Sequence, residues 1–252
     1  MLKIRDEQMQ AFEQAALNER ENRLLEYLKE FFPTHYQILG EDQARKLIDL
    51  GVDQAKTYAI TVDRELCLYI NLMLMIGSGF DTDPQLPWAA EILGNSASTN
   101  ISGKVKRLYN RAMGFLDQVA GLDNEHSERV LQKLRETPID VLLPPVTEDF
   151  TEHTLTHIRK LYPEKYALVE ETGMRGLIQT GLRRAAGYGI TSPRGTGIMI
   201  GMMFLLGHRF DIDPQFHWAK AALQDESIAD PNERVARLYE NGKAFLEKWL
   251  SK

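Results

Sequence analysis

Two copies of one short motif hold the residues best suited to chemistry in this sequence. The chain reads FDTDPQLPWA at positions 80–89 and FDIDPQFHWA at positions 210–219. Asp81 and Asp83 form a carboxylate pair in the first copy, and Asp211 and Asp213 repeat it. Paired carboxylates can bind Mg²⁺ or Ca²⁺ or work as a general acid and base. A calcium loop would also need Gly at its sixth position and Glu at its twelfth, and the motif has neither.

The motif also has a purely structural interpretation, which we favour. An Asp followed by Pro is a good N-cap with a good first helical residue, so each copy is expected to start a short helix. The other Asp of each pair is expected to accept hydrogen bonds from turn amides, while the Phe returns to the core and the Trp packs inward. A turn that the fold needs must recur in every copy, whereas an enzyme rarely needs its site twice. The motif residues are Phe80, Asp81, Asp83, Pro84 and Trp88, repeated as Phe210, Asp211, Asp213, Pro214 and Trp218.

Four histidines are candidate ligands or catalytic bases. His153 and His157 are four residues apart on a predicted helix, a spacing that can place two imidazoles on one metal. They lack the His-Glu-x-x-His order of a metalloprotease, and a solvated helix face is the favoured interpretation. His208 and His217 flank the second motif, but nothing completes a triad with them. With no nucleophile elbow and no phosphate loop after a strand, we expect no catalytic residues, no metal and no cofactor.

Arginines recur in both halves at Arg45 and Arg175, Arg64 and Arg194, and Arg107 and Arg237. We interpret these arginines as structural residues, each paired with a carboxylate near a helix end. The alternative interpretation is that they bind a partner protein. The residues that we single out for partner binding are Arg64, Arg194, His208 and His217.

The two motifs belong to a long internal repeat. When the sequence is shifted by 130 positions, residues 25–119 align with residues 155–249 without a gap, and about 30 of the 95 pairs are identical. A unit of this size is a small domain rather than a solenoid repeat, which predicts a tandem duplication. The units are residues 1–120 and 151–252, and the linker at 121–150 contains a short helix at 123–136.

The elements that must position the motif are helices, since apolar residues recur at helical spacing and no stretch alternates with period two. In the first unit we expect helices at 6–31, ended by Pro33, at 41–55, at 63–76, at 88–93 and at 104–119. Thr61 is expected to cap the helix at 63–76, which is apolar on most faces and therefore central, and Gly77 to end it. The fold class predicted is all-α, with two tandem bundles of about five helices.

Bulk composition narrows the functional class. The chain has 252 residues, 43% of them hydrophobic and 26% charged, with a net charge of −6. This balance argues against a nucleic-acid or anionic-membrane partner, because both need a basic surface. Its single cysteine, Cys67, excludes an internal disulfide and fits a reducing cytoplasm. The most apolar runs, at 66–76 and 198–206, are shorter than a bilayer span. We expect a soluble cytoplasmic protein.

The string YAITVDR followed by FDTDPQLPWA, within residues 58–93, resembles a family of small helical bacterial proteins associated with type VI secretion and polymorphic-toxin loci. The opening LKIRDEQMQAF at residues 2–12 is similar to that family's start. The second half departs from the pattern, because it lacks this opening, carries extra glycines and has His217 in place of proline.

The resemblance implies a non-enzymatic cytoplasmic partner of a secreted toxin, either an immunity protein that neutralises the toxin or an adaptor that holds it for loading. It implies no catalytic residues. Two alternatives of other classes stay open. One is a metal-dependent enzyme that uses the Asp-x-Asp-Pro turns, and the other is a structural dimeriser in which the duplication mimics a homodimer. The sequence leaves the oligomeric state open.

Overall fold

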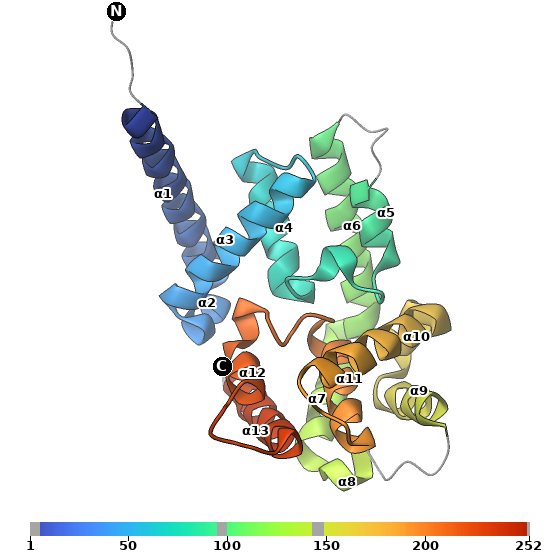
Figure 1. Cartoon of the computed structure of the whole chain (residues 1–252). Coiled ribbons are helices and arrows are strands. Elements are labelled where there is room, and N and C mark those ends of the chain that lie inside the picture. Colours follow the sequence, from blue (N-terminus) through green and yellow to red (C-terminus); the bar gives the residue numbers. More distant parts are fainter. Residues whose placement is uncertain (1–5, 95–99, 143–148, 251–252) are drawn as a thin grey trace, which may run out of the picture.

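The structure, a computed structural model, describes residues 6–94, 100–142 and 149–250, which form helices and no strand (Figure 1). The predicted all-α class is therefore confirmed for this part of the chain. Helices of the first half lie above those of the second half in the view of Figure 1. Within the described residues no helix is both long enough and apolar enough to cross a membrane.

The first half contains α1 (Asp6–Phe31), α2 (Pro33–Leu39), α3 (Glu41–Thr57), α4 (Asp63–Ile76), α5 (Pro87–Gly94) and α6 (Ile101–Ala120). The helix predicted at 63–76 has the bounds expected, and it is central, since Tyr69, Leu72 and Met73 are fully buried. α1 ends at Phe31, before Pro33, as expected. Pro33 also begins α2 as its first residue, where its missing N–H is not needed. One expectation was wrong. The N-cap of α4 is Val62, without a side-chain hydrogen bond, rather than Thr61.

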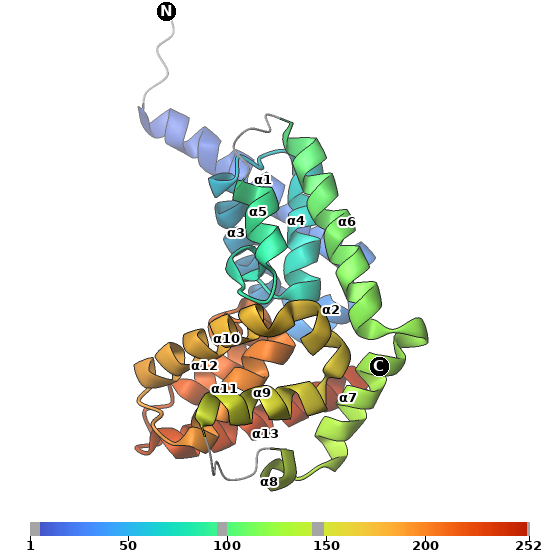
Figure 2. The ribbon, with the colours of Figure 1, turned by 90° about the vertical axis from the view of Figure 1, so that its right-hand side faces the viewer.

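The linker and second half contain α7 (Glu125–Glu136), α8 (Ile139–Leu142), α9 (Phe150–Leu161), α10 (Pro163–Gly187), α11 (Pro193–Leu206), α12 (His217–Leu223) and α13 (Pro231–Leu250). Figure 2 shows α6 running along one side of the molecule into α7, which lies beside the second half. Most of the expected linker helix at 123–136 is thus present as α7.

Unusual backbone positions recur with the 130-residue spacing of the sequence repeat. Positive φ angles occur at Gly40 (75°) and Glu170 (62°), and again at Gly77 (92°) and Gly207 (99°). The kink at Glu170 divides α10 at the place where Gly40 separates α2 from α3. The bounds of α4 and α11 also differ by 130 at both ends. The chain therefore turns in the same way at matching positions of the two halves.

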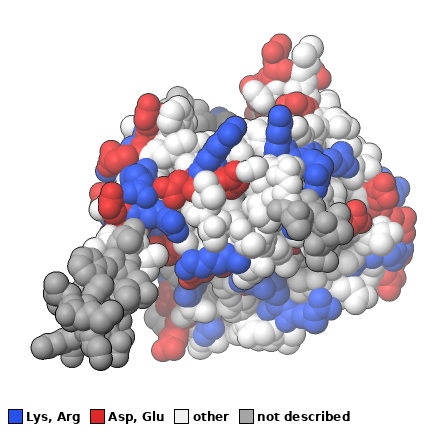
Figure 3. Space-filling model, turned by 90° about the horizontal axis from the view of Figure 1, so that it is seen from above, with Lys and Arg blue, Asp and Glu red and all other residues white. Residues whose placement is uncertain are grey.

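Charged side chains of both signs are interspersed on the face shown in Figure 3, with no large area of a single sign. Arg45 illustrates the pattern, because it pairs with the exposed Glu41 and the half-buried Glu21, and Arg175 forms exposed pairs with Glu171 and Glu152 in the second half. Exposed pairs of this kind contribute little to stability. The predicted architectural pairing of these arginines is confirmed.

Candidate functional site

The repeated motif lies where the two halves meet, and its second aspartate bonds to both of them. Oδ1 of Asp83 accepts a hydrogen bond of 2.9 Å from the backbone N–H of Gln85 in its own turn. Oδ2 accepts one of 2.9 Å from the backbone N–H of His208 in the other half. The Gln85 side-chain amide donates to the carbonyl of Met203 at 3.1 Å and to Oδ2 of Asp83 at 3.2 Å. Asp83 thus joins its own turn to the end of α11.

The second motif makes the same contacts in the opposite direction. Oδ1 of Asp213 accepts from the N–H of Gln215 at 2.9 Å, and Oδ2 accepts from the N–H of Ser78 at 2.7 Å. The Gln215 side chain donates to the carbonyl of Met73 at 2.8 Å. Ser78 and His208 are 130 positions apart, as are Met73 and Met203. We call Asp83, Gln85, Asp213 and Gln215 the inter-unit clasp, and its bonds are reciprocal between the two halves.

Two glycines let the backbones of the two halves approach each other beside the clasp. Gly77 ends α4 and Gly207 ends α11, each with its N–H bonded four residues back along the helix. A Cβ at Gly77 would lie 2.8 Å from the carbonyl oxygen of Leu206, and a Cβ at Gly207 would lie 3.3 Å from that of Ile76. Both residues also have positive φ, so the backbone conformation favours glycine at each position in addition to the close contact.

The expected local cap is present in both copies of the motif, but the expected helix start directly after it is found in the second copy and not in the first. Asp83 accepts from the amide two residues on, as a capping Asp does. However, α5 begins only at Pro87, after a turn. Asp213 caps the short 3₁₀ segment Pro214–Phe216, and α12 follows from His217. The short helix expected at 88–93 is present as α5.

The first aspartate of each motif binds a tyrosine hydroxyl rather than the turn amides we expected. Asp81 accepts from the hydroxyl of Tyr58 at 2.8 Å, and Asp211 accepts from that of Tyr188 at 2.9 Å. Arg184 adds a bidentate ion pair to Asp211, with distances of 2.7–3.1 Å. Burial, reinforced by the Asp81 bond, raises the pKa of Tyr58 to about 12. These bonds fix the motif to the turn that precedes α4 or α11.

The Phe and Trp residues of the motif pack against the hydrophobic core. Phe80 and Phe210 are fully buried, as expected. Trp88 and Trp218 are only half-buried, but both pack against core aromatics: Trp88 lies 6.2 Å from Phe115 and Trp218 5.6 Å from Phe245 between ring centroids. The inward packing predicted for the tryptophans is therefore partial.

Buried ionisable groups gather around the clasp. Burial raises the pKa of Asp213, although the amides of Ser78 and Gln215 bond to its charged form and oppose the shift. Lys165 begins the second half's α10 and donates from Nζ to the carbonyl of Phe204. Burial lowers the pKa of Lys165 to about 8, and the charge of Asp83 opposes this shift only in part. Lys165 and Asp83 line a cavity of about 260 Å³ between the halves.

The residues predicted to bind a partner are spread over the molecule. His208 is buried at the clasp, with Nδ1 3.4 Å from Oδ2 of Asp83 and Nε2 3.5 Å from Oγ1 of Thr82. His217 is exposed at the start of α12. Arg64 and Arg194 are exposed at the starts of α4 and α11, whereas the clasp lies at the other ends of these helices, about 20 Å away at 1.5 Å per residue. Of the four, His208 lies at the clasp and His217 directly follows the turn of the second motif, whereas the two arginines lie elsewhere.

The histidine pair on α9 does not converge on a shared point. The rings of His153 and His157 are stacked, with centroids 4.2 Å apart and planes at 28°. His153 is buried, and Nδ1 of His157 lies 2.8 Å from the carbonyl oxygen of His153. In the described part of the chain, no group of three or more His, Cys, Asp or Glu residues could hold a metal ion.

Sequence reasoning missed Gln85, Gln215 and Lys165 as parts of the site. Their recurrence in both copies of the motif was the one feature of the sequence that could have identified the glutamines. Lys165 aligns with His35, so no such recurrence pointed to it.

No protein-family model matches the chain, and the searches of curated proteins and of solved structures also return no match.

Proposed function

We propose that the chain is a tandem duplication whose two units, residues 1–120 and 151–252, associate as the subunits of a two-fold dimer would. The support is the 130-residue spacing shared by the sequence identities, the positive-φ positions and the clasp bonds. An isologous interface uses the same residues on both sides, and the clasp has that property. The linker at 121–150 then connects two units that a single-unit relative would bring together from two chains.

We further propose that the protein is a non-enzymatic binding protein, an immunity protein that binds and neutralises a cognate type VI secretion or polymorphic toxin in the cytoplasm. The observation that carries the non-enzymatic part is the burial of Asp83 and Asp213, whose side chains bond to main-chain amides of both halves. Carboxylates that are buried and hydrogen-bonded to backbone amides stabilise the fold and do not act in proton transfer. The toxin as partner rests on the resemblance of residues 58–93.

An effector-loading adaptor of the same system is the second candidate. An adaptor would form the same complex with the toxin but would not inhibit it. In both cases the exposed Arg64, Arg194 and His217 are the side chains assigned to the partner. The two arginines lie at the helix ends far from the clasp. A metal-dependent enzyme that uses the Asp-x-Asp-Pro turns is the rival of another class.

The test is co-expression with the toxin-like protein encoded beside this one, followed by affinity capture and measurement of host-cell survival. A tight complex that restores growth supports immunity, and a complex without rescue supports an adaptor. Replacing Arg64 and Arg194 by Glu should weaken the complex, whereas the same change at Arg107, exposed on α6, is the matched control. Absence of a complex, together with metal bound in stoichiometric amount, would favour the enzyme.

A further inference from the structure

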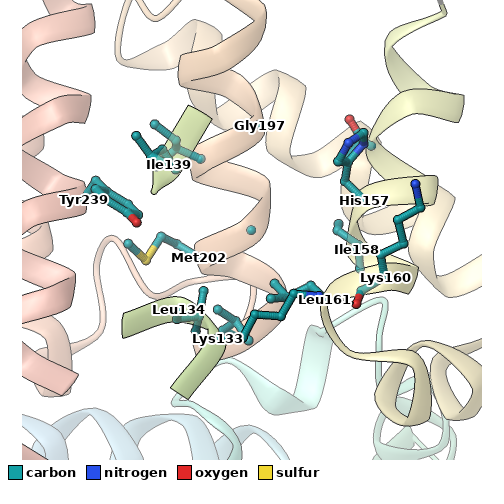
Figure 4. A pocket seen from close by; sticks show the side chains of 14 residues that line it. Lys133, Leu134, Ile139, His157, Ile158, Lys160, Leu161, Gly197, Met202 and Tyr239 are labelled. Atoms are coloured by element: carbon teal, nitrogen blue, oxygen red, sulfur yellow. Dashed lines mark hydrogen bonds between the residues drawn. The ribbon is translucent and has the colours of Figure 1, made fainter. Parts of the chain in front are cut away.

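Two apolar cavities lie under α7 in the second half, and Figure 4 shows the first of them. It measures about 110 Å³ and lies between α7, α8, α9, α11 and α13. The second measures about 290 Å³ and is lined by α7, α11, α12 and α13. Leu134, Met202, Leu205 and Tyr239 line both cavities, so only these side chains separate them. We call the two cavities together the α11 chamber.

The chamber exists because the second half carries smaller residues than the first at four lining positions. The aligned pairs, first half before second, are Leu24 and Thr154, Tyr27 and His157, Cys67 and Gly197, and Asn71 and Gly201. In the first half this place is filled, since the buried Asn71 donates a 2.8 Å hydrogen bond to the hydroxyl of Tyr27. A Cβ at Gly201 would meet no atom within 4 Å. An unfilled apolar cavity costs stability, so a space kept open in one unit and closed in the other points to an occupant.

The cover of the chamber is held mainly by polar contacts at its rim. Val130 is the residue of α7 that is buried. Arg129 pairs with Glu164 at 2.5 Å and Arg135 with Glu247 at 3.0 Å, and Nζ of Lys133 donates to the carbonyl of Lys160 at 2.8 Å. Exposed ion pairs of this kind contribute little. Apart from Val130, which is buried, and Leu134, which packs against the core, the contacts of α7 around the chamber are therefore largely polar.

The charged residues that line the two cavities are all lysines. Lys133 and Lys160 line the first cavity and Lys243 lines the second, and no acidic residue lines either one, although the chain as a whole has a net charge of −6. In Figure 4 the Lys133 side chain runs along the edge of the cavity toward Leu161. Nζ of Lys243 lies 5.9 Å from the centre of the Tyr239 ring, which lines both cavities. An apolar space with ammonium groups at its edge complements a hydrocarbon that ends in an anion.

We propose that the α11 chamber binds an anionic amphiphile, a hydrocarbon chain with a carboxylate head. The tail lies between α7 and α11, and the carboxylate meets Lys133 or Lys243. A cavity of about 150 Å³ accepts a benzene ring, so the two volumes suit a tail of roughly ten carbons. This site is separate from the toxin-binding surface and does not depend on it.

The test is calorimetric titration of the full chain with decanoate and, in parallel, with decanol. The double variant Gly201→Asn with His157→Tyr restores the first half's own hydrogen-bonded pair and should close the chamber. We expect at least a tenfold loss of decanoate affinity with the melting temperature preserved. Gly114→Asn is the matched control, because Gly114 lies within α6 and also faces open space, and its affinity should stay at the wild-type value. Gly201→Leu provides a second way to fill the space.

Replacing Lys133 and Lys243 by Met tests the head group. The change should weaken decanoate binding about tenfold and leave decanol binding unchanged. Decanoate binding that survives both chamber-filling variants would overturn the site, as would failure of both ligands to bind wild type. Equal loss of decanoate and decanol in the lysine variant would overturn the carboxylate assignment.

Discussion

Oδ2 of Asp213 accepts a hydrogen bond of 2.7 Å from the amide of Ser78, which lies 135 residues earlier in the chain. Asp83 makes the equivalent bond to the amide of His208. Each aspartate thus completes the end of a helix in the other half while its second oxygen caps its own turn. The motif is repeated because each copy needs the other.

Replacing Asp213 by Asn should destabilise the protein. The side-chain amide then turns an N–H₂ group toward backbone donors, and leaving buried donors without an acceptor costs about 1–3 kcal/mol. Chemical unfolding monitored by circular dichroism measures the loss. The control is Asp53→Asn on α3, where the side chain is 75% exposed and the change should stay within about 0.5 kcal/mol. Unchanged stability of the Asp213 variant, with loss of biological activity, would instead favour a reactive site.

Gly77→Ala should lower the free energy of unfolding by about 1–3 kcal/mol. The residue has φ 92° and ψ 148°, a region that is nearly restricted to glycine, and the new Cβ would lie 2.8 Å from a backbone carbonyl. Gly114→Ala, in open space within α6, should instead stabilise the protein by up to about 1 kcal/mol. Thermal melts of the two variants should move in opposite directions, and a shared direction would argue against the backbone contact.

Glu170→Gly should stabilise the protein by about 1 kcal/mol or more, because Glu170 has φ 62° and ψ 164° and a non-glycine residue there is strained. The first half has Gly40 at the equivalent position with φ 75° and ψ 162°. The reverse change, Gly40→Ala, should therefore destabilise by a similar amount, since its Cβ would touch nothing and only the backbone is affected. Urea unfolding of both variants checks the pair, and a Glu170→Gly variant less stable than wild type would contradict the strain.

Lys165 should make stability depend on pH in the alkaline range. Burial lowers its folded-state pKa to about 8, below the ordinary 10.5 of the unfolded chain. Between these values the unfolded state binds more protons, so the free energy of unfolding rises as pH rises from about 8 to about 10.5. Below pH 8 the buried ammonium carries its full desolvation cost.

The measurement compares wild type with Lys165→Met, which keeps the aliphatic stem. Between pH 8 and pH 10.5 the free energy of unfolding of wild type should rise relative to that of the variant, by on the order of 2 kcal/mol. Parallel curves for the two proteins would show that Lys165 titrates with its ordinary pKa.

The helical class, the repeat spacing and most helix positions could be predicted from the amino-acid sequence alone. These follow from local chemistry: helical periodicity, proline and glycine at helix ends, and the recurrence of the same side chains 130 residues apart. The prediction that Asp83 caps its own turn was correct, since its side chain accepts a hydrogen bond from the amide two residues further on.

Tertiary structure decided the rest. The second oxygen of Asp83, the side chain of Gln85 and the contact between Gly77 and Gly207 depend on which unit surfaces meet, and no local pattern encodes that pairing. The α11 chamber likewise depends on tertiary packing, because small residues such as Gly201 leave a cavity only where the helices around them do not close over the space.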